Sequence, residues 1–210
     1  MLTPVTPYIE AAMDANNLSA PNPIDEFLPE IFEREAKGYL TDALTIPAFA
    51  MESFALNEAQ SLAAVAFVAD IFKEMYQKGG LKVAGMVQDR MLFGYALVFA
   101  HPNEPHLPVY LHKIFVMEQY RGKGLGRQMM ESLTDALGSI ALLCPLDKIG
   151  FYKGLGFVEM GYDRPQDANY RLSQHLYSDL VLMTNNDEAS TAPFFLLNDN
   201  DLYGALGLKK

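Results

Sequence analysis

The feature that most constrains how this chain folds is a glycine-rich segment, residues 120–127, with the sequence YRGKGLGR. It follows an apolar run at 109–116 that predicts a buried strand, and it opens a run at 125–137 whose apolar residues recur at helical spacing. Alternate glycines let backbone N–H groups converge at a helix start, where the helix dipole favours an anion such as a pyrophosphate. Three basic side chains accompany them: Arg121, Lys123 and Arg127.

Two better-known phosphate loops do not fit this segment. The dinucleotide pattern of Rossmann folds would need a glycine where Arg127 stands, and the Walker pattern would need Gly-Lys-Ser/Thr after a four-residue gap. A glycine-rich turn with solvated charges explains the loop alone as well as a ligand site does. The neighbouring elements therefore have to decide between the two.

Around this segment the sequence predicts strands and helices. Strands are expected at 81–88, 91–100, 109–116, 140–144, 157–163 and 175–184, and helices at 125–137 and 147–154. Asp89 and Arg90 are predicted to form a tight hairpin turn between the first two strands. The predicted order is β-β-β-α-β-α-β-β.

Residues 1–80 are predicted to be mostly helical, with no convincing strand. Thr6 and Pro7 resemble a helix start, and a capping box of Asn57 and Gln60 opens a long helix over 58–78. Gly79 and Gly80 end that helix. At the other end of the chain, residues 194–208 are apolar enough to cover the body of the protein or a second subunit.

A second glycine-containing motif changes the interpretation of the first. Residues 150–157 read GFYKGLGF. Together the two segments resemble the GCN5-related N-acetyltransferases (GNAT superfamily), whose acyl-CoA motif is Arg/Gln-x-x-Gly-x-Gly/Ala and whose later motif is Phe-Tyr-x-x-x-Gly-Phe. The matching residues are Arg121, Gly124 and Gly126 in the first motif, and Phe151, Tyr152, Gly156 and Phe157 in the second. The resemblance covers about residues 81–184.

The resemblance implies an α/β (α+β) fold: a mixed, mostly antiparallel sheet flanked by helices, here with a helical N-terminal segment. We divide the chain into that helical segment at 1–80, packed on the same domain, an acetyl-CoA-binding core at 81–184 and a C-terminal extension at 185–210.

The resemblance also implies acetyl-CoA as the acyl-donating cosubstrate. The backbone of Phe115 and Val116 would bind its pantetheine arm, and the glycine loop would hold its pyrophosphate. The loop residues expected to bind the cosubstrate are Arg121, Gly122, Lys123, Gly124, Leu125, Gly126 and Arg127.

Three residues are candidates for the proton transfers that acyl transfer to an amine requires. Tyr152 suits the general acid, because a phenol can donate a proton to the leaving thiolate without being charged beforehand. His112 and Glu118 are alternative proton acceptors. Each candidate has a structural explanation as well: Tyr152 as a packed aromatic, His112 as a residue of a sheet face, and Glu118 as an exposed loop carboxylate.

The predicted function is transfer of an acetyl group from acetyl-CoA to a primary amine, by direct attack in a ternary complex. The alternative is a non-catalytic acyl-CoA sensor or interaction module, which Pro145 favours because many relatives place an asparagine there. The acceptor stays open. Small amines suit the net charge of −10 better than proteins do, and residues 194–208 allow a homodimer.

Charge and composition argue against several other classes. The net charge of −10 repels phosphate backbones and anionic lipids, so nucleic-acid and membrane partners are not expected. The sequence suggests neither a secretory signal nor a membrane span. The single cysteine, Cys144, excludes an intrachain disulfide, and His101 and His106 lack a third metal ligand nearby, so no metal is predicted. We therefore expect a cytoplasmic protein.

Overall fold

The computed structural model describes most of the chain beyond its first 21 residues. The described residues are 22–53, 56–104, 106–161, 167, 169–186 and 192–208. They form two compact units: the first contains 22–27, Tyr76–Gly161 and Leu180–Phe194, and the second contains Leu28–Met75, 195–208 and the described part of 162–179. The helix start predicted at Thr6 and Pro7 lies outside the described residues. The predicted division at residues 80 and 184 stays a prediction.

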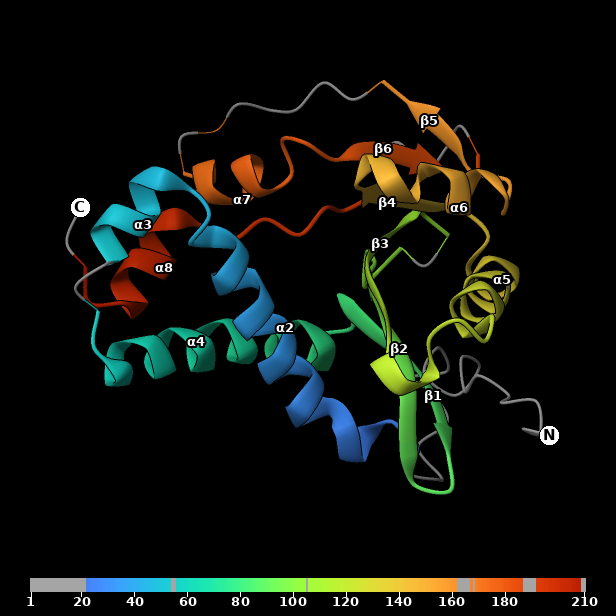
Figure 1. The fold of residues 1–210 in the computed structure, drawn as a ribbon, viewed down its shortest axis with the longest axis horizontal. Coiled ribbons are helices and arrows are strands. Elements are labelled where there is room, and N and C mark those ends of the chain that lie inside the picture. Colours follow the sequence, from blue (N-terminus) through green and yellow to red (C-terminus); the bar gives the residue numbers. More distant parts are fainter. Residues whose placement is uncertain are drawn as a thin grey trace. The chain divides into compact units, whose positions relative to one another are not determined.

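The first unit is built on one six-stranded sheet (Figure 1). Its strands are β1 (Leu81–Gln88), β2 (Met91–Phe99), β3 (Val109–Val116), β4 (Ile140–Cys144), β5 (Val158–Met160) and β6 (Val181–Thr184), in the spatial order β1-β2-β3-β4-β6-β5. Every neighbouring pair is antiparallel except β3 and β4, which are parallel. This confirms the prediction of a mixed, mostly antiparallel sheet flanked by helices.

The hairpin between β1 and β2 forms where the sequence predicted it. Asp89 and Arg90 both have positive φ, 52° and 57°, which is the backbone of a two-residue turn whose twist matches that of the strands. Both strands are buried along most of their length.

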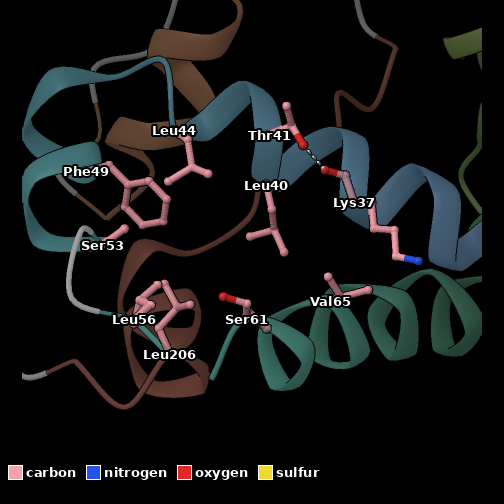
Figure 2. Close-up of a pocket in the computed structure, with 11 residues that line it drawn as sticks. Lys37, Leu40, Thr41, Leu44, Phe49, Ser53, Leu56, Ser61, Val65 and Leu206 are labelled. Atoms are coloured by element: carbon pink, nitrogen blue, oxygen red, sulfur yellow. Dashed lines mark hydrogen bonds between the residues drawn. The ribbon is translucent and has the colours of Figure 1, made fainter. Parts of the chain in front are cut away.

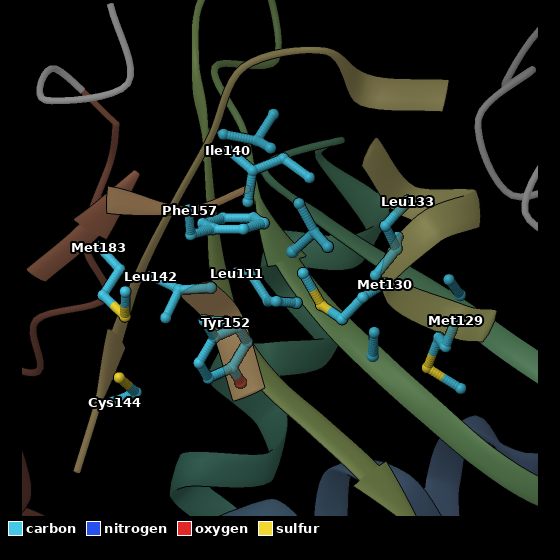
Figure 3. Close-up of a cluster of buried hydrophobic side chains, with 14 of the residues drawn as sticks. Leu111, Met129, Met130, Leu133, Ile140, Leu142, Cys144, Tyr152, Phe157 and Met183 are labelled. Carbon is cyan, nitrogen blue, oxygen red and sulfur yellow. The ribbon is translucent and has the colours of Figure 1, made fainter. Parts of the chain in front are cut away.

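Helices cover one face of this sheet and close its main core (Figure 3). They are α5 (Leu125–Leu137) and α6 (Ile149–Lys153), with the short 3-10 turns η1 (Asp25–Phe27), η2 (Glu118–Tyr120) and η3 (Leu146–Lys148) in the same unit. Met129, Met130 and Leu133 recur at helical spacing on α5, and all three are buried against the strands. Cys144, the last residue of β4, is buried in this core.

The second unit contains helices α2 (Leu28–Ala43), α3 (Pro47–Ser53), α4 (Glu58–Gln77), α7 (Arg171–Leu176) and α8 (Asp199–Ala205). The predicted capping box opens α4: Asn57 Oδ1 accepts from Gln60 N at 2.9 Å, and Gln60 Oε1 accepts from Asn57 N at 3.0 Å. Phe72 lies between Phe32 and Phe195, with ring centroids 6.3 and 5.1 Å away. The helical reading of residues 58–78 is thus confirmed, and the described residues from 22 to 80 contain no strand.

Two predicted strands are shorter than expected. The last strand was predicted at 175–184, but β6 covers only Val181–Thr184, and the preceding residues form α7. Leu172 and Ser173 are buried on this helix, so contacts distant in the sequence determine its conformation. The strand predicted at 157–163 also begins later, because Phe157 is buried in the core rather than paired, and β5 covers Val158–Met160; residues 162 and 163 lie outside the described residues.

A buried hydrogen-bond network ties the C-terminal segment to α7 within the second unit. Ser173 Oγ lies 2.8 Å from Tyr39 Oη, accepts from Leu197 N at 2.8 Å and donates to Leu197 O at 3.2 Å. Asp199 is 3% exposed, and its Oδ1 accepts from Leu172 N at 3.1 Å. Residues 195–208 are therefore held by specific polar contacts as well as by apolar burial.

Replacing Ser173 by alanine tests this network. We expect the free energy of unfolding to fall by about 1–3 kcal/mol, because the buried Leu197 N–H and Tyr39 hydroxyl lose their partner. Ser178→Ala, at an exposed position just beyond α7, is the matched control and should change stability by at most about 0.5 kcal/mol. Urea titrations of the full chain measure both values, and equal effects would contradict the assigned role of Ser173.

Candidate acyl-CoA site

The site begins where strands β3 and β4 separate. Their register covers three residue pairs, from Val109↔Ile140 to Leu111↔Leu142. Beyond these pairs β3 continues along β2 to Val116, whereas β4 continues along β6. The register between β2 and β3 shifts at the same point, and His112 is the extra residue of the resulting bulge. The bulge and the end of the parallel pairing therefore coincide at His112.

The end of β3 lies unusually close to β2 because Gly94 has no side chain. A Cβ atom at Gly94 would lie 2.5 Å from the carbonyl oxygen of Phe115 and 3.3 Å from Val116 Cα. Phe93, the next residue toward the turn, accepts a hydrogen bond from Met117 N at 2.9 Å. Gly94 thus positions the backbone that the resemblance assigns to pantetheine. The sequence analysis missed this residue, although an isolated glycine within a strand is a known sign of close backbone approach.

The glycine loop after β3 has the backbone that its sequence requires. Gly122 and Gly124 have φ values of 73° and 80°, and Gly124 is the N-cap of α5. Cβ atoms at these two positions would have no neighbour within 4 Å. The first backbone N–H groups of α5 precede any intrahelical partner and coincide with the positive end of the helix dipole. This geometry fits a phosphate or pyrophosphate group.

The basic side chains of the loop contact the protein itself. Arg121 Nε donates to the Val116 carbonyl oxygen at 2.9 Å, and its guanidinium lies 5.6 Å from the centroid of the Phe115 ring. Lys123 Nζ lies 5.4 Å from the centroid of the Tyr120 ring. Arg121 thereby joins the strand end and the loop, the two parts of the predicted cosubstrate site.

The second motif lies directly beside the first. A Cβ atom at Gly126 would be 3.9 Å from Val116 Cγ2 and 4.0 Å from Phe151 Cζ. Arg127, the next residue of α5, donates to the Gly154 carbonyl oxygen at 3.3 Å. The fold therefore brings together the strand end at Val116, the glycine loop and the segment from Phe151 to Gly154, the first and last of which lie up to 38 positions apart in the sequence.

The backbone of the second motif explains its glycine. Gly156 has φ of 88°, which lets the chain reverse so that Tyr152 O accepts from both Leu155 N and Phe157 N, at 2.9 and 3.1 Å. Phe157 is then buried beside Tyr152, with ring centroids 5.9 Å apart (Figure 3).

Tyr152 is a buried, protonated phenol. Its side chain is packed between Phe151 and Phe157 in the core of the first unit. Burial, and to a smaller extent the nearby Cys144, raises the pKa of Tyr152 to about 12. The hydroxyl therefore remains a neutral hydrogen-bond donor throughout the range in which proteins function.

His112 is a neutral imidazole. Its ring contacts Phe99 and Tyr110 edge-on, with centroids 5.4 and 5.8 Å away, and its Nδ1 is buried although part of the residue is exposed. Burial, with a smaller contribution from the charge on Lys113, lowers the pKa of His112 to about 3. Glu118, the other predicted proton acceptor, is an exposed residue at the start of η2. The two candidates therefore lie in opposite kinds of environment.

The described residues contain neither a candidate metal site nor a candidate membrane span. Within them, no three His, Cys, Asp or Glu side chains lie close enough together to hold a metal ion. None of the described helices combines the length and apolarity that crossing a bilayer requires.

The sequence of this core matches a known family. The family model described as "Acetyltransferase (GNAT) domain" matches residues 82–159. Residues 82–159 are thus similar to the GNAT acetyltransferase domain, which agrees with the resemblance drawn from the two motifs and indicates acyltransferase chemistry in general. No curated protein sequence matches the chain.

Solved structures with similar folds are distant in sequence. A protein from Corynebacterium glutamicum, described as histone acetyltransferase HPA2 and related acetyltransferase, is 16% identical with a TM-score of 0.47, over 81% of this chain and 93% of that one. Escherichia coli ElaA is 18% identical with a TM-score of 0.40, over 63% and 93%. A Bacillus subtilis acetyltransferase in complex with CoA is 17% identical with a TM-score of 0.40, over 55% and 81%.

The lowered pKa of His112 predicts a specific pH dependence of stability. The unfolded chain binds a proton on this histidine near pH 6.5, whereas the folded chain does not until about pH 3. The contribution of His112 is therefore fully present above about pH 6.5 and is lost as the pH falls toward 3.

We expect His112→Gln to flatten the decline in stability between pH 6.5 and 4. His106→Gln, which changes an exposed histidine in the same way, is the control and should leave the decline as it is. Urea unfolding at a series of pH values measures both. Parallel curves for wild type and His112→Gln would contradict the burial of a neutral imidazole.

Proposed function

We propose that this protein transfers an acetyl group from acetyl-CoA to a primary amine, with both reactants bound at once. The observation that carries the proposal is the contact between the two motifs: the open glycine loop at the start of α5 lies beside the strand end at Val116 and beside Phe151. A solvated surface turn requires no such arrangement. The loop geometry that suits an anion and the buried phenol of Tyr152 belong to the same compact unit, which supports the proposal.

In this proposal, residues 121–127 hold the pyrophosphate and the end of β3 holds the pantetheine arm. When bound, acetyl-CoA supplies a thioester whose carbonyl carbon is open to attack by a neutral amine. The Val116 carbonyl oxygen accepts a hydrogen bond from Arg121 Nε and has a second lone pair, with which it could also accept a hydrogen bond from the pantetheine arm. The terminal nitrogens of the Arg121 guanidinium could then contact a phosphate oxygen.

Tyr152 is proposed as the proton donor to the leaving sulfur. A phenol with a pKa of about 12 is a weaker acid than an ordinary thiol. It therefore acts best by hydrogen-bonding the sulfur as negative charge develops, with proton transfer completed as the carbon–sulfur bond breaks. The same raised pKa keeps the hydroxyl protonated before each turnover.

Glu118 is proposed as the proton acceptor, through a water molecule, in preference to His112. A histidine with a pKa of about 3 holds a proton too weakly to take one from an ammonium group near neutral pH. Glu118 is exposed and directly precedes the glycine loop in sequence. The net charge of −10 favours a small cationic amine as the acceptor.

Acetyl-CoA binding is tested by thermal unfolding. At about 100 times its dissociation constant, the ligand should stabilise the protein by about 2.7 kcal/mol, a rise in Tm of about 5–11 °C. Gly124→Glu should abolish the rise, because it places a negative charge at the helix start where the pyrophosphate would bind.

Gly138→Glu is the matched control for that variant. Gly138 ends the same helix, has φ of 71° and also has open space at its Cβ position. With ψ of −88°, Gly138 lies outside the left-handed region that Gly124 occupies, so a side chain there is strained at least as much, whereas the rise in Tm with acetyl-CoA should persist. The absence of any rise in the wild type would refute the cosubstrate site.

Tyr152→Phe tests the proposed proton donor. We expect turnover, measured as thiol release with a panel of amines, to fall by about 100-fold or more, since general acid catalysis contributes about 10²–10⁴-fold. The acetyl-CoA thermal shift should be retained. Tyr170→Phe, in the second unit, should change neither.

The result also separates an enzyme from a sensor. Unchanged turnover in Tyr152→Phe would remove this residue from the mechanism. Acetyl-CoA binding by the wild type without turnover of any amine would favour the alternative of a non-catalytic acyl-CoA sensor.

A further inference from the structure

The second unit contains a pocket that the acyl-CoA site does not use. Its volume is about 160 Å³, and it is lined by residues of α2, α3 and α4 and by Leu206 at the end of α8. Figure 2 shows side chains of α2 on one side of this space and side chains of α4 on the other. The apolar lining includes Leu40, Leu44, Phe49, Leu56, Val65 and Leu206.

One buried polar group faces this apolar lining. Ser53, the last residue of α3, lines the pocket and is 7% exposed. Its Oγ is buried and has no hydrogen-bond partner among the described residues. Buried hydroxyl groups almost always have a partner, because removal from water without one is costly. Because the Oγ atom itself is buried, a ligand in the pocket would supply that partner after rotation of the Ser53 side chain toward it.

The other hydroxyl groups of the lining are already engaged. Thr41 Oγ1 donates to Lys37 O at 2.8 Å, which Figure 2 marks with a dashed line. Ser61 Oγ donates to Asn57 O at 3.2 Å. Both hydrogen bonds go to carbonyl oxygens four residues earlier in the chain. Ser53 is therefore the residue of the lining whose hydroxyl group lacks a partner among the described residues.

The charge at the pocket is balanced. Lys37 is the charged residue of the lining, and its Nζ lies 2.5 Å from Glu33 Oε1, one helical turn earlier. A charged ligand would therefore gain little here and would lose its hydration in an apolar space. The lining favours a neutral ligand.

The volume limits the size of the ligand. An apolar protein cavity of roughly 150 Å³ accommodates one benzene molecule. Leu44, on the lining, is 49% exposed, so apolar surface extends from the pocket toward solvent and provides a path of entry.

We propose that this pocket binds one small, neutral, mostly apolar molecule, about the size of a six-membered ring, whose single polar group hydrogen-bonds to Ser53 Oγ. The proposal concerns the second unit and does not depend on acyl transfer.

Two probes of nearly equal shape test the hydrogen bond. p-Cresol has an apolar ring with one hydroxyl, and toluene lacks the hydroxyl. Binding to the full chain is followed by NMR of the leucine and valine methyl groups. We expect saturable binding of both probes, with p-cresol tighter by about 3- to 10-fold, the effect of one net hydrogen bond. The absence of saturable binding by either probe would overturn the proposal.

Ser53→Ala should remove the preference for p-cresol while toluene binding persists. Because the Ser53 hydroxyl has no partner to lose among the described residues, the Tm of this variant should be unchanged or higher. A preference for p-cresol that survives in Ser53→Ala would show that its hydroxyl binds elsewhere.

A second pair of variants tests the location of the ligand. Ala64 lines the pocket and is 1% exposed, so Ala64→Leu should fill part of the space and weaken both probes at least 10-fold. Ala63→Leu makes the same change at the adjacent exposed position of α4 and should leave binding unchanged. Equal probe affinity in the two variants would refute the location. Circular dichroism checks that Ala64→Leu folds, and if it does not, the Ser53→Ala comparison still decides.

Discussion

The separation of β3 from β4 is the constraint on which the candidate site depends. The two strands are parallel, so the chain needs a crossover between them, and α5 provides it. In open α/β sheets, ligands bind at the carboxyl ends of strands where neighbouring connections diverge. Here the pairing of β3 with β4 stops at Leu111, β3 continues along β2 to Val116, and the glycine loop follows after the short turn η2. The bulge at His112 lies where the pairing of β3 with β4 stops. The same change in strand pairing therefore determines both the course of β3 and the position of the loop after it.

Three glycines make this arrangement possible, each for a different reason. Gly94 allows the backbone of β2 to approach Phe115, since a Cβ there would overlap the carbonyl oxygen at 2.5 Å. Gly124 adopts the left-handed conformation that opens α5. Gly126 keeps the side of α5 that faces Val116 free of bulk. The absence of a side chain is therefore needed on β2 and on α5, and the left-handed backbone of glycine is needed where α5 begins.

Local signals in the sequence predicted much of the fold. The hairpin at Asp89 and the helix opened by Asn57 depend on neighbouring residues, and both form as expected. The strand predicted at 175–184 begins only at Val181, because α7 is determined by burial of Ser173 against segments distant in the sequence. An isolated glycine in a strand indicates close backbone approach, but which backbone approaches Gly94 follows from the register between β2 and β3. The sequence signals the motifs, whereas tertiary contacts decide where strands end.

At the candidate site, likewise, the motifs are visible in the sequence, whereas tertiary contacts determine the protonation states. Burial raises the pKa of Tyr152 to about 12 and lowers that of His112 to about 3, so one physical cause leaves both groups uncharged near neutral pH. No sequence pattern contains this information, because the burial of His112 depends on Phe99 from the neighbouring strand. Charged groups at the site include the exposed Arg121 and Glu118 and the half-buried Lys113. In the proposed mechanism a buried neutral group donates the proton, and an exposed carboxylate, which water can reach, accepts one.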